Sequence, residues 1–279
     1  MQLFATLYFY NILTENEHFQ LLKRIGYFPE IYFESAWTRY STQKHLELAK
    51  KVQNELGGCA IHLPYSGLLP GKDAPNIRET LKKATAIANL YAPIHLVGHA
   101  FYRILKDSQD SPRKHVTPIK DTLTGPDSTP NEEFIKNSLL AWNGVLEETS
   151  ANLYLENTSE RSPYPILAVL KELPADRTSM CLDIGHWHTS GMGHTWKNLP
   201  EWIKLCQDRL GHLHLHDNDG TSDQHLPIGK GRIDFHLLWS LLNQYGLNPS
   251  ITIENHEAFE LEISVDYFKD HPFKGIKKT

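Results

Sequence analysis

Cysteine is scarce in this sequence. Its three cysteines, Cys59, Cys181 and Cys206, are odd in number, widely separated and form no Cys-x-x-Cys pair. This usage argues against a disulfide framework and against a thiolate metal site, and it is typical of reduced, buried thiols in a cytosolic protein. We therefore expect three free cysteines and a cytoplasmic location.

Basic runs and long apolar runs are also missing. Apart from the short tail Lys274, Lys277 and Lys278 there is no cluster of Lys or Arg, and the formal net charge is −5. A dedicated nucleic-acid binder usually presents a basic face, so the charge balance argues against one. The first residues have no basic n-region and reach an acidic side chain by Glu15, unlike a signal peptide, and no apolar run is long enough to span a membrane. We expect neither nucleic acid nor membrane as a partner.

What the sequence does contain is a repeated alternation of short apolar runs with amphipathic stretches over its 279 residues. Eight predicted strands alternate with helices, which is the signature of a parallel sheet with crossover helices. The length also suits a barrel of eight such units, which needs about 250 residues. We predict an α/β fold, a single-domain (β/α)8 TIM barrel over residues 1–279. The predicted strands are Leu3–Tyr8, Pro29–Phe33, Cys59–Leu63, Ile94–Val97, Asn152–Leu155, Ser179–Leu182, Leu210–Leu215 and Ser250–Ile253.

Two stretches are too long to be plain connections, 107–130 and 217–233. Long segments of this kind in compact domains are usually lids, binding loops or disordered insertions. The first is rich in Lys, Asp, Ser, Thr and Pro and could be either a lid or an insertion, whereas the second carries Asp223 and His225. Because these two are separated by one residue, an extended loop would point both side chains the same way.

Side chains that ligate metals stand at the ends of the predicted strands. In a barrel all strands are parallel, so residues at their C-terminal ends meet on one face, where barrel enzymes place their active sites. Clustered carboxylates repel one another unless a cation neutralises them. Imidazoles and carboxylates without thiolates suit Zn²⁺, Mn²⁺, Fe²⁺ or Co²⁺. Isolated histidines such as His95, His212 and His236 are expected in the core or on the surface instead. The strand-end residues are His62, His99, Glu156, Asp183, His214 and Glu254, with His186, Asp223 and His225 close behind.

In this order, the segments HLPY, GHA, LENT, LDIGH, HLHD, DQHLPIGKG and IEN resemble the xylose isomerase-like TIM-barrel superfamily. The resemblance covers residues 59–256. The superfamily includes sugar-phosphate isomerases and epimerases and the AP endonuclease family 2, or endonuclease IV-like, abasic-site nucleases. The D-x-G-H and D-x-H-x-x-x-G-x-G elements are its more specific parts.

Resemblance to the isomerases and epimerases implies one divalent ion, Zn, Mn, Mg or Co, held by Glu156, Asp183, His214 and Glu254. The same resemblance implies that the two glutamates move the substrate proton. Ketohexose epimerases carry a further acidic residue and an arginine where this chain has Ser162 and Gly220.

Resemblance to the nucleases implies two or three ions. All nine nuclease ligand positions find matches, namely the four residues above together with His62, His99, His186, Asp223 and His225. The opening MQLFATLYFYN lacks the early Gly-Ala-His strand of that family.

Two functions therefore stay open. The favoured interpretation is a metal-dependent isomerase or epimerase of a small sugar, polyol or sugar phosphate, acting through a metal-stabilised enediolate with Glu156 and Glu254 as acid and base. The alternative is a multi-zinc phosphoesterase, either nuclease-like or acting on a small phosphodiester. For substrate binding we single out His186, His188, Tyr65 and Lys230, and a homo-oligomer is compatible with either function.

Overall fold

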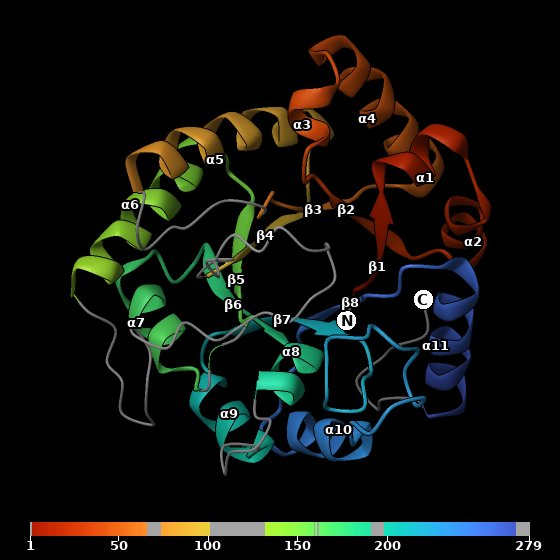
Figure 1. Cartoon of the computed structure of the whole chain (residues 1–279), viewed down its shortest axis with the longest axis vertical. Helices are drawn as coiled ribbons and strands as arrows, with labels where there is room; N and C mark the ends of the chain where they lie inside the picture. Colours follow the sequence, from red (N-terminus) through yellow and green to blue (C-terminus); the bar gives the residue numbers. More distant parts are fainter. Residues whose placement is uncertain are drawn as a thin grey trace, which may run out of the picture.

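The computed structural model describes residues 2–65, 74–100, 132–158, 160, 162–190 and 198–271. Eight parallel strands, each bonded to its neighbours in chain order, close into a barrel, and helices form a ring around it (Figure 1). The predicted (β/α)8 barrel is confirmed. The strands are β1 Leu3–Tyr8, β2 Phe28–Tyr32, β3 Ala60–His62, β4 His95–His99, β5 Asn152–Glu156, β6 Thr178–Asp183, β7 Leu210–Leu215 and β8 Ser250–Ile253.

The helices carry the capping signals that their sequences lead one to expect. Ser41 accepts a hydrogen bond from the Lys44 amide at the start of α4, and Gly57, with φ of 77°, closes the same helix. Asp234 likewise caps α10. The helices are α1 Phe9–Thr14, α2 Glu17–Ile25, α3 Ala36–Arg39, α4 Thr42–Leu56, α5 Ala74–Ala88, α6 Glu132–Glu148, α7 Tyr164–Glu172, α8 Ile184–Ser190, α9 Leu199–Cys206, α10 Phe235–Gln244 and α11 Ala258–Asp270, with a 3₁₀ turn at Asn89–Tyr91.

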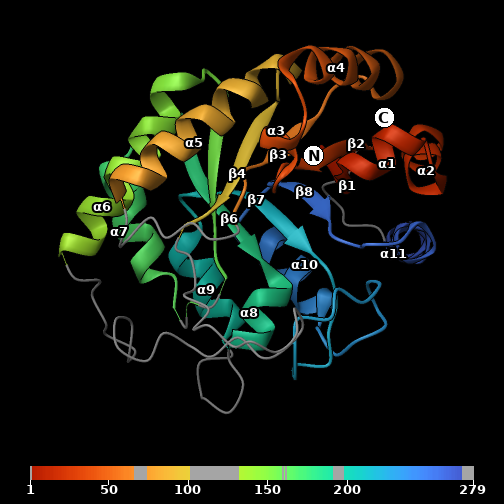
Figure 2. The same cartoon turned by 45° about the horizontal axis from the view of Figure 1, so that its top comes forward.

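Helix α8 was not predicted, and neither was α1. Each follows directly on a strand, β6 and β1 respectively, and α8 lies beside β7 in both views (Figure 2). Both are short and carry too few turns to show a helical period in the sequence. Helix α8 matters for the site because it contains His186.

The pairing register decides which side chains meet at the C-terminal end of the barrel. Tyr32 is level with His62, His99 with Glu156, and Asp183 with His214. Strands enclosed on both faces bury nearly all of their side chains, so these polar residues lie inside the protein. The register thus brings acids and imidazoles from different strands to one level.

The predictions about the two long connections, membrane spans and cysteines can be compared with the structure. The stretch 107–130 lies outside the described residues, whereas 217–233 is described. Among the described residues, no helix is both long and apolar enough to cross a membrane. The three cysteines are buried and unpaired, as expected.

Candidate metal centre at the barrel mouth

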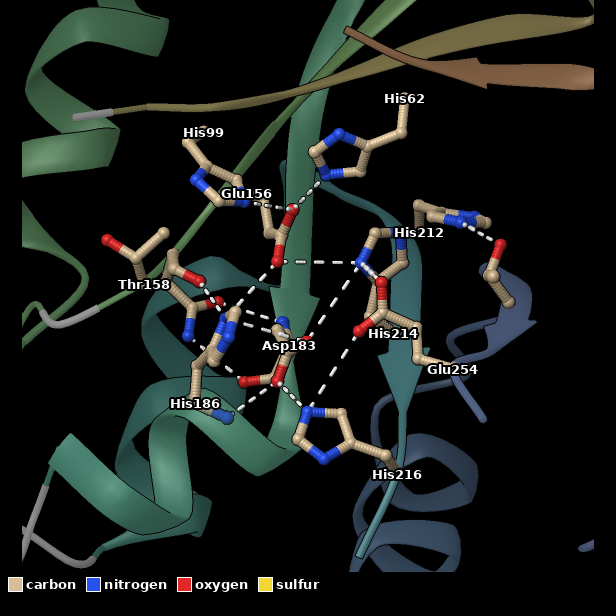
Figure 3. Close-up of polar contacts among 12 residues, drawn as sticks. His62, His99, Glu156, Thr158, Asp183, His186, His212, His214, His216 and Glu254 are labelled. Carbon is tan, nitrogen blue, oxygen red and sulfur yellow. Dashed lines mark hydrogen bonds and ion pairs between the residues drawn. The ribbon is translucent and has the colours of Figure 1, made fainter. Parts of the chain in front are cut away.

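Four predicted ligands form a central group at the barrel mouth (Figure 3). Nδ1 of His214 lies 3.0 Å from Oε1 of Glu254, 3.5 Å from Oε1 of Glu156 and 3.9 Å from Oδ2 of Asp183. All four side chains are almost fully buried. Three carboxylates thus surround one imidazole nitrogen, where burial makes their mutual repulsion costly.

A pair of histidines flanks this group on the side of β3 and β4. Nε2 of His62 lies 2.9 Å from Oε2 of Glu156, and Nε2 of His99 lies 3.4 Å from the same oxygen. Oε1 of Glu156 faces His214 instead. The two oxygens of one carboxylate therefore face two different sets of nitrogen donors, as Figure 3 shows.

A second flanking group surrounds Asp223. Its Oδ2 lies 3.2 Å from Nε2 of His186 and 3.3 Å from Nε2 of His225, and its Oδ1 lies 3.5 Å from Nε2 of His216. Nε2 of His216 is also 3.3 Å from Oδ1 of Asp183, so it joins this group to the central one. These contacts bring all nine predicted metal-type residues together at the mouth.

His216 belongs to the cluster but was not predicted, although the sequence contains a signal for it. His212, His214 and His216 alternate along and just past β7, and residues spaced by two point to the same side of a strand. All three are buried. The period of two predicts that His216 continues the inward-facing row, one step beyond His214.

The expected geometry of the 217–233 loop was partly wrong. His225 has φ of 50°, in the left-handed region, so the chain at Asp223–His225 is not extended. The two side chains nevertheless converge, because Nδ1 of His225 lies 3.0 Å from the Glu254 carbonyl oxygen, which holds the ring above the barrel.

Asp217 explains how the loop keeps its shape. Its carboxylate accepts hydrogen bonds from the backbone amides of Asn218, Gly229, Gly231 and Ile233. A Cβ on Gly231 would collide with Oδ1 of Asp217. The Gly-Lys-Gly segment thus wraps around a buried carboxylate and leaves Lys230 exposed.

Gly185, the glycine of the D-x-G-H element, is also required because a side chain would not fit there. A Cβ on Gly185 would collide with Cε1 of His216. Oδ1 of Asp183 also accepts a hydrogen bond of 2.6 Å from the His186 amide, which fixes the turn between strand and helix. The element places Asp183 and His186 in the cluster and leaves room for His216.

Tyrosines line the side of the mouth formed by β1 to β3. The Tyr32 ring stacks on His62 with centroids 4.4 Å apart, and its hydroxyl donates a hydrogen bond to Glu254. Tyr65 stacks on His99 at 4.6 Å, and the Tyr8 hydroxyl is 2.6 Å from Nδ1 of His256. Tyr65 was expected at the site; Tyr8 and Tyr32 were missed, because tyrosines in apolar strands give no distinctive motif.

Two residues expected to bind substrate face elsewhere. Nδ1 of His188 is 2.6 Å from Oδ1 of Asn218, beneath the loop. Lys230 is exposed, and no described contact connects either residue with the cluster. His186, by contrast, lies within it, with Nδ1 3.2 Å from Oε1 of Glu156.

Charges in the cluster are strongly coupled. Burial would raise the pKa of Asp223, but the imidazoles of His186 and His225 hold it well below its usual range. Burial would lower the pKa of His225, but the charge of Asp223 raises it to about 9. Protons on imidazoles therefore balance the carboxylates, and a divalent cation that binds the same atoms would displace those protons.

The donor atoms fit a divalent cation. Oδ2 of Asp183, Nδ1 of His214 and Nε2 of His216 are buried, and none makes a hydrogen bond within the described part of the chain. Buried polar atoms are normally satisfied, so three orphans in one cluster indicate a missing partner. Imidazole nitrogens and carboxylate oxygens are the ligands preferred by Zn²⁺ and similar ions.

The chain resembles known proteins over most of its length. Residues 19–271 match the family model described as a xylose isomerase-like TIM barrel. The chain belongs to this family. Two uncharacterized proteins of Methanocaldococcus jannaschii are relatives: MJ1614 is 29% identical over 135 residues, 48% of this chain, and MJ1311 is 30% identical over 113 residues, 39% of this chain. The matched regions span 51% and 36% of those relatives.

Solved structures share the fold of this family member over nearly its whole length. A D-tagatose 3-epimerase-like protein covers 97% of both chains at 21% identity, with a TM-score of 0.68. The TTHB071 protein from Thermus thermophilus, in a structure soaked with ZnCl2, covers 100% of both chains at 20% identity, with a TM-score of 0.71. D-psicose 3-epimerase from Clostridium cellulolyticum H10 covers 98% of this chain and 99% of its own at 14% identity, with a TM-score of 0.68.

Proposed function

We propose that this protein is a divalent-metal-dependent phosphoesterase that holds more than one ion at the barrel mouth. The observation that carries the proposal is the double use of Glu156, whose Oε2 faces His62 and His99 while its Oε1 faces His214. A carboxylate in this position can bridge two ions. An isomerase with a single ion does not require His62, His99 or a separate group around Asp223.

The three donor sets would divide the ligands as follows. Glu156, Asp183, His214 and Glu254 would hold a central ion, His62 and His99 would share Glu156 with a second, and His186, Asp223 and His225 would hold a third. His216 stands between the first and third sets, 3.3 Å from Asp183 and 3.5 Å from Asp223. Bound ions would supply the positive charge that activates water and neutralises the leaving oxygen.

Other side chains of this protein would position the metal ligands. Tyr32 donates to Glu254 and fixes the carboxylate, and Asp217 holds the loop that presents Asp223 and His225. No described Lys or Arg contacts the cluster, so substrate charge would be met by the ions. With a net charge of −5, this supports a small phosphoester over nucleic acid.

The second candidate is the sugar isomerase or epimerase. It is favoured by the central group, in which Glu156 and Glu254 both approach Nδ1 of His214 and would act as the acid and base across a bound sugar. Solved structures of the same fold are also named as sugar epimerases. One divalent ion would suffice for this chemistry.

The loop variants Asp223→Ala and His225→Ala separate the two functions. Metal content of protein purified without chelator and cleavage of bis-p-nitrophenyl phosphate are measured for wild type and both variants. The phosphoesterase predicts two or three ions in the wild type, with one ion and the hydrolysis lost in each variant. Ser222→Ala, an exposed side chain in the same loop, is the control and should change neither.

The opposite result favours the isomerase. It would consist of one ion in all variants, no phosphodiester cleavage, and exchange of a sugar C–H proton with D2O that is detectable by NMR. Asp223→Ala and His225→Ala would then change only substrate affinity.

A further inference from the structure

A second polar layer lies inside the barrel, directly beneath the mouth. Its members are Glu30 on β2, His95 on β4, His212 on β7 and Thr252 on β8, all at most 2% exposed. We call these four residues the floor. His212 precedes His214 by two residues on β7 (Figure 3). The floor and the mouth are therefore consecutive layers of the same barrel.

Glu30 connects the two layers. Its Oε1 lies 3.0 Å from Nε2 of His214, whereas Nδ1 of the same ring faces the carboxylates of the mouth. The imidazole is therefore held between an acid below and acids above. Its two nitrogens face different carboxylates, each at 3.0 Å, and neither contact has the geometry of a hydrogen bond.

The other floor residues hold Glu30 in place. The Thr252 hydroxyl donates a hydrogen bond of 2.6 Å to Oε2 of Glu30, and Nε2 of His212 lies 3.3 Å from the same oxygen. Nε2 of His212 is also 2.9 Å from Oγ1 of Thr252, and Nδ1 is 2.6 Å from Oγ of Ser250. A buried charge is tolerated only when it is paired and hydrogen-bonded, and these partners supply that stabilisation at Oε2.

The hydroxyl directions define the protons along this chain of contacts. Because Thr252 donates its only hydroxyl hydrogen to Glu30, it can only accept from Nε2–H of His212. The Thr252 hydroxyl and Nε2–H of His212 thus both direct a hydrogen toward Oε2 of Glu30. Oε1 is left to face His214.

We infer that Glu30 is a positioning residue, which keeps a proton on Nε2 of His214 and so directs the Nδ1 lone pair toward the central ion. This inference rests on the metal binding in the proposed function. Histidines that bind metals almost always pass their other N–H to a carboxylate, a carbonyl or water, and losing that partner typically weakens metal affinity 10- to 100-fold. No other described carboxylate approaches Nε2 of His214.

The test compares Glu30→Ala and Glu30→Gln with Thr6→Val. Thr6 is equally buried on β1 and level with Glu30, but its hydroxyl makes no hydrogen bond to a described residue. Zinc affinity of each metal-free protein is measured by competition with a chromogenic chelator, together with its unfolding free energy. The imidazole ¹⁵N shifts of His214 in the zinc-loaded protein report which nitrogen carries the proton.

Glu30→Ala should lower the zinc affinity of one site about 10- to 100-fold. Glu30→Gln should lower it about tenfold or less, since its amide oxygen can still accept from Nε2–H of His214. Thr6→Val should leave zinc affinity unchanged. The Gln variant keeps the side-chain volume, so the test survives if the Ala variant does not fold.

Three results would overturn the inference. The first is unchanged zinc affinity in both Glu30 variants. The second is a loss of zinc affinity that is proportional to the loss of unfolding free energy and that also occurs in Thr6→Val. The third is the loss of an ion from His95→Asn. That loss would mean that His95 and Glu30 bind an ion within the floor, so that Glu30 is a ligand itself. If wild type binds no divalent ion, the proposed function fails together with the inference; if wild type binds and the Glu30 variants match it, the inference fails alone.

Discussion

The mouth and the floor of this barrel contain the same residue types in different proportions. The floor places one carboxylate, Glu30, near His95, His212 and His214, and a hydroxyl from Thr252 donates to it. The mouth instead gathers four carboxylates, Glu156, Asp183, Asp223 and Glu254, and leaves buried atoms of Asp183, His214 and His216 without hydrogen bonds within the described residues. The excess of acid distinguishes the mouth, as the candidate cation site, from the floor, where one carboxylate is surrounded by imidazoles and a hydroxyl.

The largest expected effect comes from the acid shared between donor sets. Glu156→Gln should lower turnover at least about a thousandfold and reduce the bound metal by more than one ion, because both carboxylate oxygens lose their charge. Turnover and metal content are measured together. Glu172→Gln, an exposed acid on α7, is the control, and retention of all ions by Glu156→Gln would remove the bridging role.

Removing the metal should destabilise the protein through the mouth alone. At an ion concentration 100 times the Kd, each site adds about 2.7 kcal/mol to the unfolding free energy, and a chelator should remove it. In Glu254→Gln the chelator effect should shrink, since one central ligand is lost. An equal chelator effect in wild type and in this variant would contradict the assignment.

A histidine outside both layers should contribute to the acid sensitivity of the protein. Burial lowers the pKa of His18 on α2 to about 4, against an ordinary value of 6.5. The unfolded chain therefore binds the proton more tightly, so stability falls as the pH drops from 6.5 to 4, by about 3 kcal/mol in total.

Replacing His18 isolates this contribution. His18→Gln should flatten the dependence of unfolding free energy on pH between 6.5 and 4, measured by urea denaturation of the chelated protein. The surface variant His236→Gln should leave the slope as it is in wild type. An unchanged slope in His18→Gln would show that other groups cause the acid sensitivity.

The smallest effect concerns the contact between a tyrosine and an acid of the mouth. Tyr32→Phe removes the hydroxyl that donates to Glu254 but keeps the ring stacked on His62. A hydrogen bond to a charged group contributes about 1.5–3 kcal/mol, so activity should fall about 10- to 150-fold while metal content stays complete. Loss of an ion in this variant would mean that Tyr32 helps to hold the metal rather than to orient its ligand.

The barrel and the main constituents of its mouth follow from the amino-acid pattern alone. Alternating apolar runs and amphipathic helices specify eight parallel strands, and parallel strands oblige their C-terminal ends to meet. His62, His99, Glu156 and Asp183 stand at the last position of their strands, so one topological rule was enough to gather them.

The remaining features of the site depend on register and loop closure, which arise only when the chain has folded. Glu30 lies in the apolar segment Phe-Pro-Glu-Ile-Tyr and belongs to no motif, yet the closed barrel sets it 3.0 Å from His214. Asp223 and His225 converge through a left-handed residue and a loop wrapped around Asp217, not through an extended chain. A linear pattern fixes which way a residue faces along its own strand. How deep it lies relative to residues of other strands is fixed only when the strands close around one axis.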